Sequence, residues 1–168
     1  MKGNIYLSGF MGTGKSVVGK SLAKKMGRPF VDLDHLIEKK SGCTIAELFS
    51  RRGEMDFRRL EHQQLSTVAK RTNAVVSLGG GALLDRRNRD IVRRTGVLIR
   101  LTCSRRELIR RLRRTRAQRP LLAGGSLDTK VARLISERRH AYGGAELTVS
   151  TTRLSNTQAA SLIARRLA

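Results

Sequence analysis

A glycine-rich octapeptide near the N-terminus, GFMGTGKS at residues 9–16, has the residue types that bind nucleotide phosphates. It fits the pattern G-x-x-x-x-G-K-[ST] at every fixed position. Glycines let backbone N–H groups converge on phosphate oxygens, and the N-terminus of a following helix adds a partial positive charge. In this pattern Lys15 reaches the β- and γ-phosphates, and the Ser16 hydroxyl is a magnesium ligand. We predict nucleotide contacts from Gly12, Thr13, Gly14, Lys15, Ser16 and Val17.

An acid is also needed near the phosphates, and the apolar run AVVSL at 74–78 ends in glycines rather than in an aspartate. Asp32 and Asp34 supply carboxylates at the end of the run FVDLD (30–34). If that run is a strand throughout, the two side chains lie on one face. Asp32 is then a magnesium ligand, whereas Asp34 orients an acceptor hydroxyl or takes its proton. The alternative role for Asp34 is to cap the helix that begins at LIEKK.

The apolar pattern places these motifs in an alternating series of strands and helices. Runs that read as buried strands lie at 4–8, 30–34, 74–78, 96–101 and 146–149. One helix begins at Lys15 and ends at Gly27, and capping-box spacing marks further helix starts at Thr44, Ser104 and Ser155. This alternation predicts an α/β fold with three αβα layers around a five-stranded parallel sheet. The length of 168 residues fits a single domain, 1–168.

Composition limits the class of protein. The net charge is +22, and residues 86–119 hold fourteen arginines against two acids, so the chain favours anionic ligands such as nucleotides, acidic metabolites or nucleic acid. The alternative is that these arginines are solvated on helix faces. Two cysteines and three histidines show no metal-binding spacing, and the GTPase tetrapeptide N-K-x-D is missing. No apolar run approaches the roughly 20 residues of a membrane span, so we expect a cytoplasmic protein without membrane contact.

Taken together, these motifs make the chain resemble the shikimate kinases, P-loop kinases that use ATP and Mg²⁺ to phosphorylate the 3-hydroxyl of shikimate in aromatic amino acid biosynthesis. The resemblance covers nearly the whole chain, with the motifs in family order. They are GFMGTGKS, DLD (32–34), GEMDFRRLE (53–61), SLGGGA (77–82), RPLL (119–122) and ERRHAY (137–142). It implies a nucleoside-monophosphate-kinase-like fold, a substrate-binding helical region at about 34–62, a mobile lid at about 114–126, and a monomer.

The resemblance also implies roles for individual side chains. Arg58 and Arg138 bind the substrate carboxylate, and Asp34, Gly80 and Gly81 contact the rest of the substrate. The lid residue Arg119 closes over the phosphates and completes the catalytic set with Lys15 and Asp34. Arg153 packs near the adenine.

Some alternatives remain open on the sequence alone. Without the family, Arg58 reads as a surface partner of Glu61, three residues along one helix. His140-Ala141 stand where the family has Pro-Leu, so the choice between Arg138 and Arg139 is open. The 114–119 segment is also about two residues shorter than is common in the family. This puts the geometry of the lid in question rather than the reaction.

Two other functions fit parts of the sequence. One is a kinase for another small hydroxy acid such as gluconate, because two arginines suit any carboxylate. The other is a nucleotide-gated protein whose 86–119 region binds RNA or another polyanion. Aromatic residues make up only 4% of the chain, which disfavours base stacking. We therefore expect no specific nucleic-acid partner.

Overall fold

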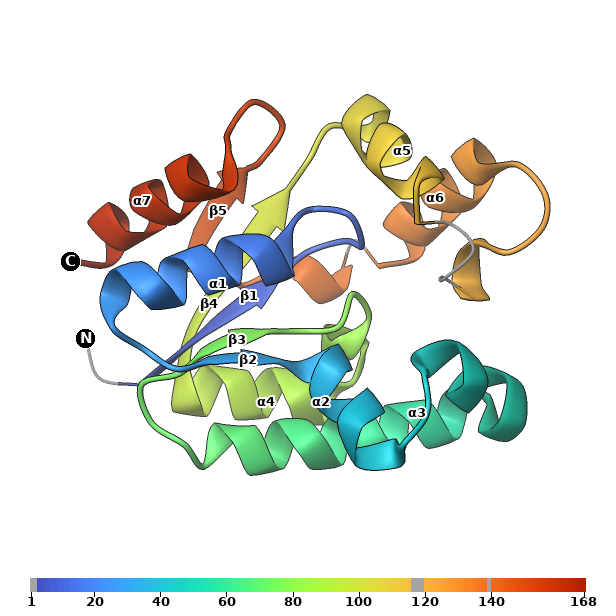
Figure 1. Cartoon of the computed structure of the whole chain (residues 1–168), viewed down its shortest axis with the longest axis horizontal. Coiled ribbons are helices and arrows are strands. Elements are labelled where there is room, and N and C mark those ends of the chain that lie inside the picture. The colour runs from blue at the N-terminus through green and yellow to red at the C-terminus, as the bar shows by residue number, and fades with distance from the viewer. Residues whose placement is uncertain (1–2, 116–119, 139) are drawn as a thin grey trace.

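The computed structural model describes residues 3–115, 120–138 and 140–168, and its centre is one parallel sheet (Figure 1). The strands are β1 (Asn4–Ser8), β2 (Phe30–Asp32), β3 (Val75–Ser77), β4 (Gly96–Thr102) and β5 (Leu147–Ser150), in the order β2-β3-β1-β4-β5. The central strand β1 pairs Ile5 with Val75 on one side and with Val97 on the other. The predicted five-stranded parallel sheet is confirmed.

Helices cover both faces of this sheet, as predicted (Figure 1). Helices α1 (Lys15–Met26) and α7 (Asn156–Leu167) pack together on one face. Helices α2 (Leu33–Ser41), α3 (Ile45–Ala69) and α4 (Arg86–Thr95) cover the other. Helices α5 (Arg105–Arg113) and α6 (Leu127–Glu137) pack on each other beyond the carboxyl end of β4. Short 3-10 helices are η1 (Ala82–Leu84), η3 (Pro120–Leu122) and η4 (His140–Tyr142).

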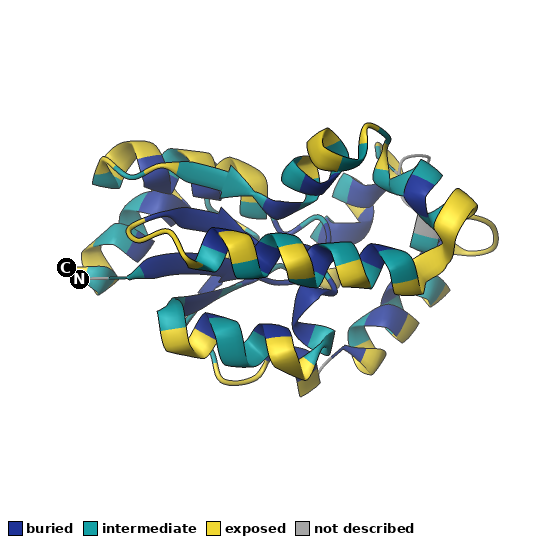
Figure 2. Ribbon diagram, turned by 90° about the horizontal axis from the view of Figure 1, so that it is seen from below, coloured by how far each residue is buried: buried dark blue, intermediate teal, exposed yellow. Residues whose placement is uncertain are grey.

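Alternation along β1 divides the core between the two faces. Ile5 and Leu7 are buried against α1 and α7, whereas Tyr6 is buried on the face of α2, α3 and α4. Side chains of a strand point alternately to the two faces of the sheet, so residues of β1 contribute to the apolar core on each face. Figure 2 shows the result: the central strands β1 and β3 are buried, and the helices keep an exposed stripe toward solvent. Phe10 and Met11 join a third cluster with α5, α6 and Leu122.

The predicted strand at 30–34 is wrong in its last two residues. Strand β2 ends at Asp32, and α2 begins at Leu33. The Asp32 carboxylate accepts a hydrogen bond from the backbone N–H of His35, at 3.3 Å, and so caps the helix. Leu33 and Ile37, four residues apart, are both buried, as expected for one helical face. Asp34 therefore lies on a helix, and the inference that strand geometry puts Asp32 and Asp34 on one face fails.

The predicted helix starts are confirmed, with one difference in detail. Thr44 and Ser155 form reciprocal capping boxes with Glu47 and Gln158. Ser104 caps α5, but the Glu107 side chain pairs instead with arginines of its own helix. Helix α3 is bent at Gly53, where φ is 77°, in the left-handed region that favours glycine. The turns of α3 before this bend lie with α2 beyond the carboxyl edge of the sheet (Figure 1).

No helix in the described part of the chain is long and apolar enough to cross a membrane. Cys43 and Cys103 are both free thiols.

Candidate active site

The octapeptide 9–16 forms a tight loop between β1 and α1. Gly14, with φ 93°, precedes the first turn of α1, and buried Thr13 donates its hydroxyl to the Phe10 carbonyl at 2.7 Å. The Lys15 ammonium folds back over the loop and donates to the carbonyls of Gly9 (2.9 Å) and Phe10 (3.3 Å). Ser16 and Val17 are exposed on the first turn of α1. This is the strand, loop and helix arrangement that binds phosphate at a helix N-terminus.

Two residues far along the chain hold this loop from the side of β5. The Thr151 hydroxyl donates to the Thr13 carbonyl at 2.9 Å. Arg111 of α5 donates to the Gly12 carbonyl at 3.2 Å and to the Thr151 carbonyl at 2.9 Å. Sequence reasoning did not single out Arg111 from its arginine-rich surroundings. Besides Glu107 of its own helix, its partners Gly12 and Thr151 lie 99 and 40 residues away, so no local spacing marks its contact with the loop.

Arg153, predicted near the adenine, is exposed two residues beyond Thr151. It forms no hydrogen bond or ion pair with any described residue. Arg119, the predicted lid arginine, lies outside the described residues. Its neighbours Leu121 and Leu122 are described: Leu122 is buried against the loop residues Phe10 and Met11, and Leu121 lines the pocket beside them.

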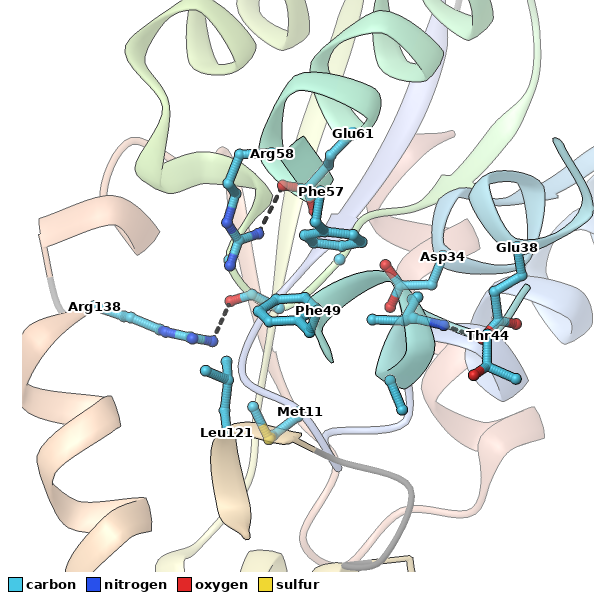
Figure 3. A pocket seen from close by; sticks show the side chains of 15 residues that line it. Met11, Asp34, Glu38, Thr44, Phe49, Phe57, Arg58, Glu61, Leu121 and Arg138 are labelled. Carbon is cyan, nitrogen blue, oxygen red and sulfur yellow. Dashed lines mark hydrogen bonds and ion pairs between the residues drawn. The ribbon is translucent and has the colours of Figure 1, made fainter. Parts of the chain in front are cut away.

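A cavity of about 640 Å³ opens beside the phosphate loop, under the bent end of α3 (Figure 3). Met11 of the loop forms part of its wall, so the two sites are adjacent. Polar and charged side chains of Asp34, Glu38, Thr44, Arg58, Glu61 and Arg138 line it, with Gly79, Gly80 and Gly81 and the apolar residues Ile45, Ala46, Phe49, Phe57 and Leu121. The predicted substrate residues Asp34, Arg58, Gly80, Gly81 and Arg138 thus all line one cavity, although they come from four separate segments.

Arg58 reaches the cavity from α3, held by two carboxylates of the same helix. Its Nη1 donates to Glu61 at 2.7 Å, and its Nε and Nη2 donate to Glu54 at 3.3 and 3.0 Å. A guanidinium has five N–H bonds, so two of them have no acceptor among the described residues. Arg58 therefore both pairs with Glu61 and faces the cavity, so the two interpretations of this residue are compatible.

Glu61 is the residue whose importance sequence reasoning missed. It has 0% exposure, and its Oε1 has no hydrogen-bond partner among the described residues. Burial raises the pKa of Glu61 to about 7; Arg58 opposes this shift, and the neighbouring Asp34 adds to it. A signal was present in the sequence, since a position three residues after Arg58 shares its helix face. The burial of that face was not visible.

Arg138 reaches the cavity from the end of α6, and its guanidinium lies at the same end of the cavity as that of Arg58, across from Asp34 (Figure 3). It is 4% exposed, and its Nη1 donates to the Gly80 carbonyl at 3.2 Å. Tyr142 donates its hydroxyl to the same carbonyl at 2.6 Å. Arg139, the other candidate for the second substrate arginine, lies outside the described residues. Of the two candidates, Arg138 and Arg139, it is Arg138 that the structure shows lining the cavity.

The three glycines after β3 allow this crowding. A methyl group on Gly79 would contact Glu61 Oε1 and lie 2.7 Å from Asp34 Oδ1. A methyl group on Gly81 would lie 2.6 Å from Nη2 of Arg58. Among the described residues, the backbone N–H groups of Gly80 and Gly81 have no acceptor. The cavity therefore combines two cationic side chains, three carboxylates and two backbone donors, a set that suits a small anionic molecule bearing hydroxyls.

The magnesium ligands predicted from the sequence are compatible with this arrangement. Ser16 begins α1, and half-buried Asp32 ends β2, so both lie at the carboxyl edge of the sheet. No group of three His, Cys, Asp or Glu side chains in the described ranges is arranged to hold a metal. One hydroxyl and one carboxylate nevertheless fit Mg²⁺, an ion that prefers oxygen ligands and takes the rest from phosphates and water.

Comparison with known proteins adds independent evidence. A family model described as shikimate kinase matches residues 11–168. A shikimate kinase of Geobacter metallireducens is 43% identical over 149 residues, which are 89% of this chain and 83% of the relative. One of Pelotomaculum thermopropionicum is 41% identical, over 93% of this chain and 90% of the relative.

Solved structures of shikimate kinases are also similar to this chain. Shikimate kinase from Acinetobacter baumannii in complex with shikimate superposes with a TM-score of 0.94 at 34% identity, covering 98% of this chain and 92% of that one. Shikimate kinase from Bacteroides thetaiotaomicron has a TM-score of 0.89 at 36% identity, covering 99% and 97%. Motif order, cavity lining and these similarities agree with one another, and the chain belongs to the shikimate kinase family.

Proposed function

We propose that this protein transfers the γ-phosphoryl group of ATP to the 3-hydroxyl of shikimate. One observation carries the proposal: Arg58 and Arg138, from two separate helices, line one end of a cavity that also contains Asp34 and adjoins a phosphate-binding loop. Arginines at one end and an acid near the loop match a ring that bears a carboxylate and hydroxyls.

At the nucleotide end, the loop N–H groups and the start of α1 would hold the phosphates. Lys15, which rests on the Gly9 and Phe10 carbonyls, would exchange these contacts for the β- and γ-phosphate oxygens. Arg119 would add positive charge to the transferring group and exclude water when the 114–126 lid closes. Arg153 would lie by the adenine, since neighbouring Thr151 contacts the loop.

Ser16 and Asp32 would hold magnesium. The bound ion would neutralise phosphate charge and so favour attack by the hydroxyl. Asp32 serves as the α2 cap at the same time, because one carboxylate oxygen accepts from His35 and the other is available.

At the acceptor end, Arg58 and Arg138 would bind the carboxylate of shikimate, with the N–H groups of Gly80 and Gly81 donating to its oxygens. A planar guanidinium offers paired donors to a carboxylate, which fixes the ring rather than merely attracting it. Asp34 would accept a hydrogen bond from the 3-hydroxyl, aim its oxygen at the γ-phosphorus and receive its proton. Glu61, one turn from Arg58, holds that guanidinium in place.

The regions named from the sequence keep their proposed roles. Residues 34–62 would form the substrate-binding helical region and residues 114–126 the lid of a single domain. We also propose that the protein acts as a cytoplasmic monomer.

The assay that tests this function measures ADP release by a coupled enzyme system with ATP and magnesium, with and without shikimate. Shikimate-dependent ADP release is expected; a folded protein that releases none refutes the proposal. Arg58→Ala should raise the shikimate KM by ten- to a hundredfold, because a charge-assisted contact is worth about 1.5–3 kcal/mol. Glu54→Gln is the matched control, since Glu54 contacts Arg58 at the exposed side of the helix.

Two alternatives are separated by further measurements. Gluconate should not replace shikimate, either in ADP release or in raising the melting temperature; a larger effect of gluconate would favour that substrate. RNA binding should vanish near 150 mM salt if it is generic attraction to the arginines. Tight binding at that salt would favour a polyanion-binding protein.

A further inference from the structure

We propose that Tyr142 is a positioning residue of this site: its hydroxyl fixes the peptide between Gly80 and Gly81 so that the Gly81 N–H faces the substrate. The identity of that substrate rests on the function proposed above. The arrangement of the peptide does not, and it can be tested without turnover.

The contact itself is short and buried. Tyr142 is 6% exposed, and its hydroxyl donates to the Gly80 carbonyl at 2.6 Å. Arg138 donates to the same oxygen at 3.2 Å. A carbonyl oxygen has two lone pairs, so these two donors occupy both. The segment 138–142 supplies both of them, and its turn is closed by a hydrogen bond from the Ala141 N–H to the Arg138 carbonyl at 3.1 Å.

Because the peptide group is planar, this contact also fixes the direction of the N–H group of the next residue, Gly81. In a trans peptide the C=O of one residue and the N–H of the next point in opposite directions. No described peptide bond in the chain is cis. Holding the Gly80 carbonyl against Tyr142 therefore holds the Gly81 N–H on the opposite side of that peptide. This N–H has no acceptor in the described part of the chain, and Gly81 lines the cavity.

The glycine segment needs such an external contact. The Gly79 and Gly81 carbonyls are held locally, by the N–H groups of Ala82 (3.1 Å) and Leu84 (3.0 Å). The Gly80 carbonyl has no local partner among the described residues and receives hydrogen bonds only from the 138–142 segment. Glycine also has the widest choice of backbone conformations, so an unheld Gly80–Gly81 peptide would rotate easily.

The ring of Tyr142 is held as well as its hydroxyl. The guanidinium carbon of Arg100, on β4, lies 5.5 Å from the centre of the ring, within the range of a cation–π contact. Burial raises the pKa of Tyr142, and this keeps the hydroxyl protonated as a donor. Arg100, Tyr142 and Gly80 thus form a chain of contacts from the sheet to the floor of the cavity.

The test compares Tyr142→Phe with Tyr6→Phe. Tyr6 is a matched control because it is fully buried and its hydroxyl is also hydrogen-bonded, to Thr95 at 2.7 Å. Tyr142→Phe should raise the shikimate KM about tenfold, the effect of roughly 1.4 kcal/mol, with kcat and the KM for ATP within about twofold of wild type. Tyr6→Phe should leave both KM values unchanged. An unchanged shikimate KM in Tyr142→Phe, or an equal rise for ATP, overturns the proposal.

Amide NMR of the ligand-free protein tests the arrangement independently of catalysis. The Gly81 N–H signal should move in Tyr142→Phe and stay in place in Tyr6→Phe; an unmoved signal overturns the proposal. If the wild-type protein gave no shikimate-dependent turnover, the proposed function would fail while this result would still decide the role of Tyr142. If Tyr142→Phe does not fold, Arg100→Gln serves instead, with a shift of the same Gly81 signal expected and its absence counting against the proposal.

Discussion

Replacing the buried carboxylate of Glu61 by an amide should make the unfolding free energy less dependent on pH near neutrality. Glu61 has 0% exposure, one of its oxygens accepts from Arg58 at 2.7 Å, and the other has no hydrogen-bond partner among the described residues. Burial, opposed by Arg58, raises the pKa of this carboxyl from 4.5 to about 7. The folded protein therefore holds a proton on Glu61 at pH values where the unfolded chain has lost it.

The sign and size follow from this difference. An acid with a raised pKa adds stability that is fully present below pH 4.5 and is lost as the pH rises through about 7. The total is about 3 kcal/mol, because one pKa unit corresponds to roughly 1.4 kcal/mol. About 2 kcal/mol of it falls between roughly pH 5.5 and 8. The wild-type protein should therefore lose that amount of unfolding free energy across this window through Glu61.

Urea unfolding at several pH values, for wild type, Glu61→Gln and Glu54→Gln, measures the effect. Between roughly pH 5.5 and 8, the unfolding free energy of Glu61→Gln should fall by about 2 kcal/mol less than that of wild type. Glu54→Gln should keep the wild-type dependence, because Glu54 touches the same arginine but its side chain is 50% exposed. The histidines are common to all three proteins and cancel in the comparison. If Glu61→Gln loses stability with pH as steeply as wild type, Glu61 does not titrate in this window and the reasoning from its burial is wrong.

Three other substitutions test the site. Lys15→Ala should lower kcat at least a thousandfold by removing charge from the phosphates, with an unchanged circular dichroism spectrum; measurable turnover would remove Lys15 from the mechanism. Asp34→Asn should lower kcat by about a hundredfold or more with a smaller change in shikimate KM, as expected for loss of a proton acceptor, and a wild-type kcat would contradict that role. Gly79→Ala should cost about 1–3 kcal/mol of unfolding free energy and reduce turnover, because its methyl group would displace Glu61 and Asp34. Gly27→Ala is the control for backbone strain without a clash, since open space surrounds Gly27 but its φ is 62°; it should lose stability and keep wild-type turnover. A Gly79→Ala protein as stable and active as wild type would show that the carboxylates can move.

Features that depend on residues close together in the chain could be predicted from the sequence. The loop 9–16 needs a strand, a run of glycines and a helix, and all three lie within one short segment. The capping boxes at Thr44 and Ser155 are contacts across three residues. Alternating strands and helices also determine a parallel sheet, because parallel neighbours require crossovers. The family motifs then named five residues that line one cavity.

The error at Asp34 shows where local reasoning reaches its limit. FVDLD holds Phe30, Val31 and Leu33 with an acid on either side of Leu33, a short pattern that is compatible with a strand over all five residues. The competing interaction is the cap formed by Asp32. With this cap, α2 begins at the next residue, Leu33, and buries Leu33 and Ile37 on one helical face. Which of the two wins depends on what covers the sheet at that place, and the segment itself does not contain that information.

By itself, then, the sequence determined the phosphate loop, the class of fold, the family and most of the residues that meet in the cavity. The tertiary structure alone decided how those residues are held. Arg111 reaches Gly12 across 99 positions, and Tyr142 reaches Gly80 across 62. Glu61 looks like any surface member of an i, i+3 pair until the fold buries it against Gly79, beyond the end of β3. Hydrogen bonds and burial act over a few ångströms in space, whereas sequence patterns report neighbours along the chain, and these contacts join segments that only the folded sheet brings together.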